Sequence, residues 1–248
     1  MFDQSNPLAK RMFNVLKTEG IKGFFRRIKD RLRSKWYGYH VFVTSRQFAS
    51  VSEALEFPAQ LDPTIVLMLE RCQRVLSSLT FKQVNESDGG EIDELTAIDH
   101  WGHSRKSIIK WLQEGWCCYV AKFGNRIVAY IWTKAGPEFY EPILRRWFTL
   151  ADDEVYATRT FCLPDWRGRG VTPMLTKWIV NHLALTEGVR KYIGWVRVDN
   201  VNQIHTLEQM GWSVVGRLGI IETFGVCLQY IRGQRAFSAT KKRFSIRG

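Results

Sequence analysis

A short glycine-rich segment between two different periodic patterns places the strongest limit on how this chain can fold. The segment RGRGVTP at residues 167–173 follows a β-rich run at residues 154–163 and precedes helical periodicity at residues 171–185. Glycines let the backbone turn tightly and point several N–H groups the same way, and a helix start adds a positive dipole end. A strand, this loop and a helix therefore predict a cradle suited to phosphate.

Two features narrow the interpretation of this segment. Apolar residues at helical spacing follow it (Val171, Leu175, Ile179 and Leu183), which argues against a disordered arginine-glycine tail. The spacing GxGxxG is absent, which disfavours a dinucleotide-binding fold.

Periodicity and turn residues predict alternating strands and helices along the rest of the chain. We expect helices at residues 8–35, 62–76, 91–98, 104–114, 171–185 and 200–210. We expect strands at residues 39–43, 79–84, 116–121, 127–134, 154–163, 191–198, 212–217 and 225–231. The residues at 137–149 give no clear pattern.

The chain has 248 residues, 45% hydrophobic and 24% charged, which is ordinary globular composition and excludes collagen-like, coiled-coil and wholly disordered classes. This length is near the upper limit for one hydrophobic core. We therefore predict an N-terminal extension at residues 1–77, one main domain at 78–232 and a C-terminal tail at 233–248.

The net charge of +12 is concentrated at the two ends of the chain. Residues 1–36 carry a net charge of +7 and residues 232–248 carry +6, so the stretch between them is almost neutral. Basic ends favour an anionic partner, such as a membrane surface, an acidic carrier protein, an anionic glycan or nucleic acid. Nucleic acid is the weakest of these, and it predicts affinity that falls steeply with salt.

The N-terminal helix is amphipathic. Ile21, Phe24, Phe25, Ile28 and Leu32 share one face, opposite a basic face. The helix suits either an interfacial position on a membrane or docking on its own domain. The first residues lack the apolar core of a signal peptide, and no apolar run is long enough to span a bilayer. We therefore expect a cytoplasmic protein, with the inner membrane face as an alternative.

The chain has five cysteines, and their spacing does not match that of a metal site: Cys72, Cys117, Cys118, Cys162 and Cys227. No CxxC pair occurs, so we expect buried free thiols in a reducing compartment and no metal.

The order of elements resembles the GNAT superfamily of acyl-CoA-dependent N-acyltransferases, over about residues 79–231. Three pieces carry the resemblance. They are CLPDWRGRG at residues 162–170, the pair Val198 and Asn200, and the helix from Asn200 to Met210-Gly211-Trp212. The basic lead helix and Val171-Thr172-Pro173 are similar to a bacterial branch of that superfamily. The resemblance implies an α/β (α+β) fold with a central mixed, largely antiparallel sheet flanked by helices.

The resemblance also implies where coenzyme A would bind. Backbone N–H groups of residues 169–172 would hold the pyrophosphate, with Arg167 and Arg169 beside it. The pantetheine arm would pair with the strand edge, and Asn200 would line the gap that holds the thioester. The implied cofactor-binding residues are Phe161, Cys162, Leu163, Arg167, Gly168, Arg169, Gly170, Val171, Thr172 and Asn200.

Direct transfer to an amine needs a base, a donor to the carbonyl and an acid for the leaving thiolate. Many family members use a tyrosine as the acid, and the matching position here is Leu207. Candidate bases are Glu154 and Tyr156, on one face of their strand with Thr158, and His100 and His103, between two predicted helices. Each of them also has a structural interpretation, as a surface, capping or core residue.

We therefore predict an N-acetyltransferase that moves an acetyl group from acetyl-CoA to a primary amine of a small molecule or amino sugar. Two alternatives stay open. One is a long-chain N-acyltransferase that uses acyl carrier protein or acyl-CoA at a membrane. The other is a non-catalytic CoA-binding protein, which the absence of a tyrosine at position 207 would suit.

Overall fold

The computed structural model describes residues 40–55, 63–99, 102–141, 146–223 and 226–233. The predicted lead helix, His100 and residues 234–248 lie outside these ranges. The chain divides into two compact units, one of Val41–Arg217 with Arg232–Gly248 and one of Met1–His40 with Leu218–Ile231. The second unit contains the later part of β9 (Ser213–Thr223) and most of β10 (Val226–Gly233).

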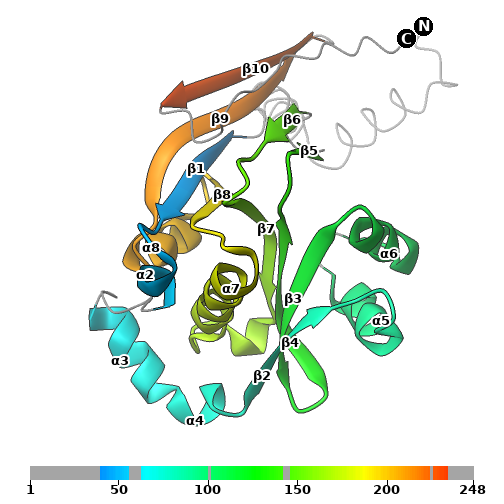
Figure 1. Ribbon diagram of the computed structural model, residues 1–248, viewed down its shortest axis with the longest axis vertical. Helices are drawn as coiled ribbons and strands as arrows, with labels where there is room; N and C mark the ends of the chain where they lie inside the picture. Colours follow the sequence, from blue (N-terminus) through cyan, green and yellow to red (C-terminus); the bar gives the residue numbers. More distant parts are fainter. Residues whose placement is uncertain (1–39, 56–62, 100–101, 142–145, 224–225, 234–248) are drawn as a thin grey trace, which may run out of the picture. The chain divides into compact units, whose positions relative to one another are not determined.

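A mixed sheet forms the centre of the larger unit (Figure 1). Its strands are ordered β9-β1-β8-β7-β4-β3-β2, where β1 is His40–Gln47, β2 is Leu79–Val84 and β3 is Trp116–Phe123. The remaining strands are β4 (Arg126–Lys134), β7 (Glu154–Cys162) and β8 (Lys191–Arg197). Each described pair is antiparallel except β7 with β8, which confirms the predicted fold class.

Strand β1 pairs with β8 along its length, from Val41 opposite Arg197 to Gln47 opposite Lys191. Val41 and Val43 are buried there. Residues 41–47 thus belong to the same sheet as the strands that follow residue 78. The helices that follow are α2 (Val51–Leu55), α3 (Pro63–Arg71) and α4 (Gln73–Leu76).

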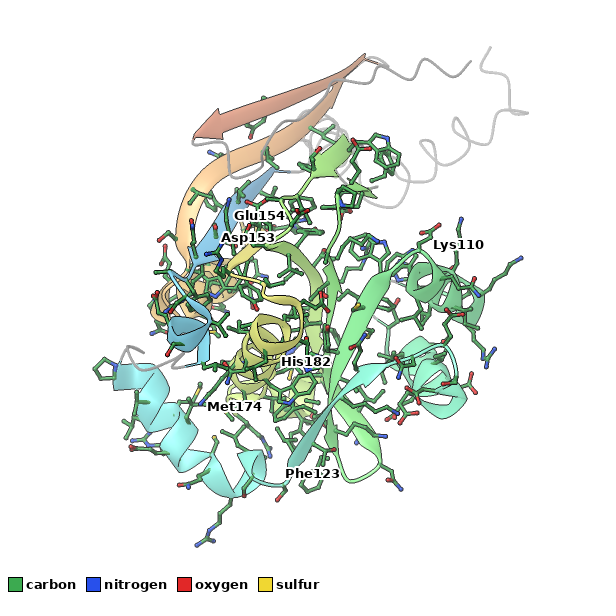
Figure 2. The ribbon with its side chains drawn as sticks, viewed as in Figure 1. Lys110, Phe123, Asp153, Glu154, Met174 and His182 are labelled. Carbon is green, nitrogen blue, oxygen red and sulfur yellow. The ribbon has the colours of Figure 1, made fainter. Side chains whose placement is uncertain are left out.

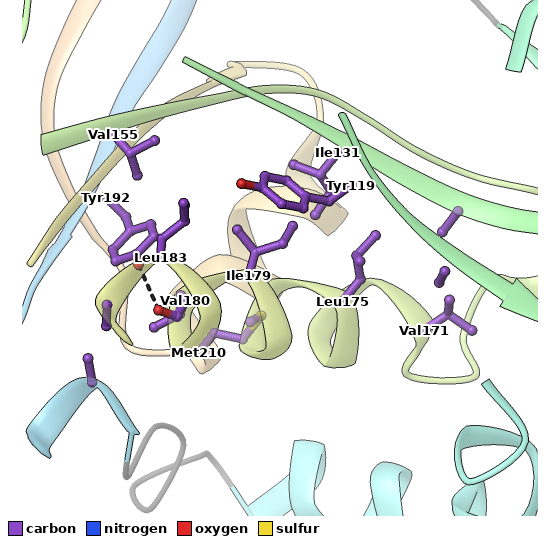
Figure 3. Close-up of a cluster of buried hydrophobic side chains, with 14 of the residues drawn as sticks. Tyr119, Ile131, Val155, Val171, Leu175, Ile179, Val180, Leu183, Tyr192 and Met210 are labelled. Carbon is purple, nitrogen blue, oxygen red and sulfur yellow. Dashed lines mark hydrogen bonds between the residues drawn. The ribbon is translucent and has the colours of Figure 1, made fainter. Parts of the chain in front are cut away.

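Helix α7 (Val171–Glu187) packs on β3, β4 and β7, and the main hydrophobic core lies beneath it (Figure 3). Leu175, Ile179 and Leu183 recur at helical spacing and are buried against the sheet. Tyr192 of β8 donates a hydrogen bond from its hydroxyl to the carbonyl oxygen of Val180 at 2.8 Å, which joins helix and sheet. Gly188 ends the helix in the left-handed conformation.

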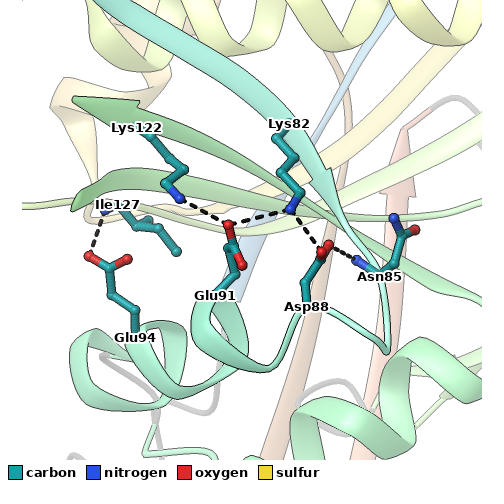
Figure 4. A network of polar contacts seen from close by, with 7 residues as sticks. All are labelled: Lys82, Asn85, Asp88, Glu91, Glu94, Lys122 and Ile127. Carbon is teal, nitrogen blue, oxygen red and sulfur yellow. Dashed lines mark hydrogen bonds and ion pairs between the residues drawn. The ribbon is translucent and has the colours of Figure 1, made fainter. Parts of the chain in front are cut away.

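Helices α5 (Gly89–Ile98) and α6 (Arg105–Gln113) contact β4 and β3 and lie on the other side of these strands from α7 (Figure 1). A polar network fastens α5 to the sheet (Figure 4). In it the Glu91 carboxylate accepts from Lys122 Nζ at 2.9 Å and from Lys82 Nζ at 3.3 Å. Glu94 accepts from the Ile127 backbone N–H. This network fixes the helix whose C-terminal end carries Asp99.

The unassigned residues at 137–149 form a second small sheet. Its strands are β5 (Glu138–Glu141) and β6 (Arg146–Thr149), paired antiparallel. Phe139 and Phe148 are buried, whereas Tyr140 and Trp147 are exposed. The chain is completed by a 3₁₀ turn, η1 (Pro164–Trp166), and by α8 (Val201–Gln209). No helix among the described residues is long and apolar enough to cross a membrane.

Candidate functional site

Strands β7 and β8 separate in the middle of the sheet. They pair in parallel from Glu154 with Lys191 to Ala157 with Gly194, and the pairing then ends. Beyond this point, within the part of the chain that the structure describes, β7 continues to pair with β4 and β8 continues to pair with β1. Backbone groups on the facing edges of the two strands therefore become available for hydrogen bonds to an extended ligand.

Gly194 stands at the last paired position. A Cβ atom there would lie 3.2 Å from the carbonyl oxygen of Ala157, so the two backbones approach each other closely just before they part. Trp195 is the next residue on β8, past the last described pair with β7, and there β8 continues to pair with β1 through Val43.

The glycine-rich loop follows the C-terminal end of β7, which pairs with β4. Gly168 and Gly170 have φ angles of +70° and +74°, in the left-handed region that favours glycine. Gly170 is the N-cap of α7, and its carbonyl oxygen accepts from Met174 N at 3.0 Å. The loop is therefore followed at once by the N-terminus of the 17-residue helix α7, where the helix dipole is positive.

Two arginines stand on this loop, and both are exposed. The Nε of Arg167 donates to the carbonyl oxygen of Cys162 at 3.1 Å. The guanidinium of Arg169 lies over the Trp166 ring, 5.6 Å from its centroid. These contacts hold both positive charges near the helix start, where they reinforce its attraction for an anion.

The other predicted cofactor-binding residues lie around this loop. Phe161 pairs with Tyr130 of β4, and the Leu163 N–H donates to the carbonyl oxygen of Val128 at 2.9 Å. Burial raises the pKa of the Cys162 thiol, so this cysteine is suited to packing and not to nucleophilic attack. Thr172 hydrogen-bonds to this thiol from the first turn of α7.

Asn200 and Leu207 have local structural roles at helix α8. The Asn200 side chain accepts from the Gln203 N–H at 3.3 Å and so caps the helix. Leu207 packs against the main hydrophobic core. Position 207 thus provides no proton for a leaving thiolate.

A carboxylate and an imidazole meet between α5 and α6. Asp99 Oδ2 accepts from the backbone N–H of His103 at 2.7 Å and lies 2.8 Å from His103 Nδ1. Asp99 Oδ1 accepts from the Tyr130 hydroxyl at 2.7 Å. Burial alone would raise the pKa of Asp99, but these hydrogen bonds lower it below its usual range.

This pairing fixes the orientation of the histidine. An ionised carboxylate only accepts hydrogen bonds, so Nδ1 of His103 carries a proton and donates it to Asp99. In the neutral imidazole, Nε2 is then the acceptor, and no bond of Nε2 to a described residue is found. The buried carboxylate thereby fixes the orientation and the tautomer of the His103 ring.

An aromatic cluster links this histidine with the separated strands. It comprises Trp111, Trp116, Phe139, Phe148, Tyr156 and Trp195, from six different elements. The His103 ring lies 4.4 Å from Trp111, and Tyr156 lies 4.4 Å from Trp195, both between centroids. Trp116 connects the two halves, because its ring is close to both Trp111 and Tyr156.

Three polar side chains lie within or beside this cluster. The Tyr156 hydroxyl donates to Glu141 Oε2 at 3.1 Å, and Glu141 Oε1 lies 3.9 Å from Arg159 Nη2. Burial, and then the charge of Glu141, raise the pKa of Tyr156 well above its usual range. Tyr156 therefore stays protonated and can donate a hydrogen bond, but it is not suited to act as a base.

Glu154 is the first residue of β7, two positions before Tyr156 (Figure 2). Its carboxylate accepts from the Ala151 N–H at 2.9 Å and forms an ion pair with Lys191. Of the four predicted catalytic residues, the structure brings His103 and Tyr156 to opposite ends of the aromatic cluster. His100 lies outside the described residues.

Sequence reasoning missed Asp99, Glu141 and Arg159. Asp99 carries a recognisable signal, because it stands four residues before His103 in a turn between helices. Glu141 falls in the stretch that gave no pattern, and Arg159 falls inside an unremarkable strand pattern. No group of three or more His, Cys, Asp or Glu that could hold a metal ion occurs among the described residues.

Comparisons with known proteins agree with this architecture. A sequence profile of the acetyltransferase (GNAT) family matches residues 81–212, more than half of the chain. Comparison with curated proteins finds no significant match.

Solved structures of similar fold include several acetyltransferases. An aminoglycoside acetyltransferase from an uncultured soil metagenomic sample is 12% identical, with 54% of this chain and 88% of that chain covered and a TM-score of 0.42. The aminoglycoside N-acetyltransferase AAC(6')-Iy in complex with CoA is 14% identical, with coverage of 66% and 95% and a TM-score of 0.44. A ribosomal-protein-alanine N-acetyltransferase from Brucella melitensis biovar Abortus 2308 is 14% identical, with coverage of 67% and 99% and a TM-score of 0.42. The profile match over residues 81–212 shows that the chain belongs to the acetyltransferase (GNAT) family.

Proposed function

We propose that this protein transfers an acetyl group from acetyl-CoA to a primary amine of a small molecule or amino sugar. The observation that carries the proposal is the separation of β7 from β8 directly before the glycine-rich loop and the start of α7. The loop suits a pyrophosphate, and the open strand edge suits the amide groups of a pantetheine arm. The family membership supports the same donor.

His103 is the base in this proposal. It takes a proton from the acceptor ammonium at Nε2, while Asp99 holds Nδ1 and stabilises the imidazolium. The neutral amine attacks the thioester carbonyl carbon, a C–N bond forms, and the C–S bond breaks. When the tetrahedral intermediate collapses, the nitrogen gives its second proton to water and the thiolate takes one proton from water. The products are the acetamide, the free thiol of CoA and the one proton that His103 had received.

Turnover tests the proposal. Purified protein is mixed with acetyl-CoA and a panel of amino sugars, polyamines and amino acids, and release of the CoA thiol is measured. We expect amine-dependent release that falls by about 10²–10⁴-fold in His103→Gln, the range typical of a lost general base. His205→Gln is the matched control, because His205 is exposed on α8.

Other outcomes separate the alternatives. CoA binding without thiol release from any amine would indicate a non-catalytic CoA-binding protein. A strong preference for long-chain acyl-CoA or for acyl carrier protein over acetyl-CoA would replace the proposed donor. Either result would contradict the proposed reaction.

A further inference from the structure

Arg159 interrupts the regular course of β7. Its φ angle is +48°, in the left-handed region that a residue with a side chain rarely adopts. Arg159 and Thr160 together stand opposite one residue of β4, Ile131, between the pairs Trp132 with Thr158 and Tyr130 with Phe161. This β-bulge turns the Arg159 side chain toward the aromatic cluster.

The guanidinium is almost fully buried there, with 6% of the side chain exposed. Its central carbon lies 4.0 Å from the centroid of Trp111 and 5.9 Å from that of Trp116. The Glu141 carboxylate, at 3.9 Å, offsets its charge but lies beyond hydrogen-bond distance.

Two nitrogens of Arg159, Nε and Nη1, have no hydrogen-bond partner among the described residues. Buried polar groups are nearly always hydrogen-bonded, and a missing partner on a charged group is especially costly. A strained backbone that holds such a group beside an active site points to a ligand that completes it. The atom that Nε and Nη1 of Arg159 require from such a ligand is a hydrogen-bond acceptor, such as an oxygen.

We propose that Arg159 binds a carboxylate on the acceptor, so that the acceptor is an amino acid or a similar amino carboxylate. A carboxylate matches the planar array of N–H donors on a guanidinium better than a single hydroxyl does. The inference rests on the proposed acetyl transfer and narrows its acceptor class.

The position of His103 supports this class. The His103 ring and the Arg159 guanidinium both contact Trp111. An acceptor with its amine at His103 and its carboxylate at Arg159 needs only a few bonds between the two groups, as in an amino acid. The surrounding rings favour an apolar or aromatic side chain on that acceptor.

Binding of paired product analogues tests the inference without any turnover. The protein is saturated with CoA and titrated in a calorimeter with N-acetyl-L-phenylalanine and, separately, with N-acetyl-2-phenylethylamine, which differs only by the carboxylate. Leucine and methionine derivatives form further pairs. We expect the acid of at least one pair to bind the wild type about 10- to 100-fold more tightly than its neutral partner, typical of a charge-assisted bond.

Arg159→Gln removes the charge and is expected to bring both members of that pair within about 3-fold of each other, the size of a weak residual effect. Arg159→Lys is expected to keep part of the preference. CoA binding to each variant is the control for a folded protein. A purely structural Arg159 would change both members equally.

Three results would overturn the inference. They are equal binding of acid and neutral compound to the wild type, an unchanged preference in Arg159→Gln, and no binding of any acid. The wild-type comparison stands even if Arg159→Gln does not fold. If the acids bind but no amine is acetylated, the proposed reaction fails while the carboxylate site stands.

Discussion

His103 Nδ1 lies 2.8 Å from a carboxylate oxygen of Asp99, which is only 6% exposed and is also held by the Tyr130 hydroxyl. This arrangement orients the imidazole, so it connects the structure of the α5–α6 turn with the proposed chemistry. Asp99→Asn is expected to lower kcat by about 10²-fold or more while the fold persists, because an amide NH₂ in place of the carboxylate favours the wrong tautomer. Steady-state kinetics check this, and an unchanged kcat would show that Asp99 has only a structural role.

Asp99 also predicts how stability depends on pH. Its pKa is lower in the folded state than the ordinary value of 3.8, so its ionised form stabilises the fold. That stabilisation is complete above about pH 5 and is lost as pH falls through the folded-state pKa, below the ordinary value. The free energy of unfolding of Asp99→Asn should therefore be lower than that of the wild type above pH 5. It should also fall less steeply as the pH is lowered through this range. Asp93→Asn, whose carboxylate is 65% exposed, is the control and should behave like the wild type.

The two glycines of the loop are expected to differ in their tolerance of a side chain. Gly168→Ala and Gly170→Ala each place an alanine at a positive φ, which costs about 1–2 kcal/mol. A Cβ at Gly168 would meet nothing within 4 Å, whereas a Cβ at Gly170 would lie 2.9 Å from Leu69 Cδ2 and 3.5 Å from both Leu76 Cδ1 and Met68 Cε. Urea unfolding should show the larger loss for Gly170→Ala. An equal loss of unfolding free energy in the two variants would mean that α3 can move away from the new methyl group without destabilising the protein.

The core beneath α7 offers a direct test of the packing. Leu175 is fully buried, whereas Leu185 on the same helix is 64% exposed. Leu175→Ala should lower the free energy of unfolding by about 2–5 kcal/mol, through lost burial and a residual cavity. Leu185→Ala should change it by less than about 0.5 kcal/mol. Similar effects of the two substitutions would contradict the assigned orientation of α7.

Local patterns predicted the secondary structure well. Apolar spacing and the flanking glycines located α7, and alternating runs around Gly124 located β3 and β4. The position of β1 could not be predicted in this way, because the choice of β8 as its partner depends on residues about 150 positions away. The β5–β6 hairpin was missed because aromatic and charged residues there follow no simple alternation.

The site was predicted in part. The glycine loop was visible as a motif, and His103 was one of four candidate catalytic residues, whose role stays a prediction. Arg159 was not, because a period of two assumes a regular strand, and the bulge at Arg159 breaks that period. Such a bulge depends on the pairing of β7 with β4 and leaves no local sign in the residue types.

Binding of acetyl-CoA at the glycine-rich loop is the central claim, and the unfolding temperature with and without this ligand tests it most directly. A ligand that binds only the folded state stabilises it by about 2.7 kcal/mol at one hundred times its Kd. Arg169→Glu places a negative charge on the exposed loop and should lose most of the shift. Lys110→Glu is the matched control, at a side chain on α6 that is 71% exposed (Figure 2), and should keep it. The absence of a shift in the wild type at millimolar acetyl-CoA, or an equal shift in Arg169→Glu, would contradict the account.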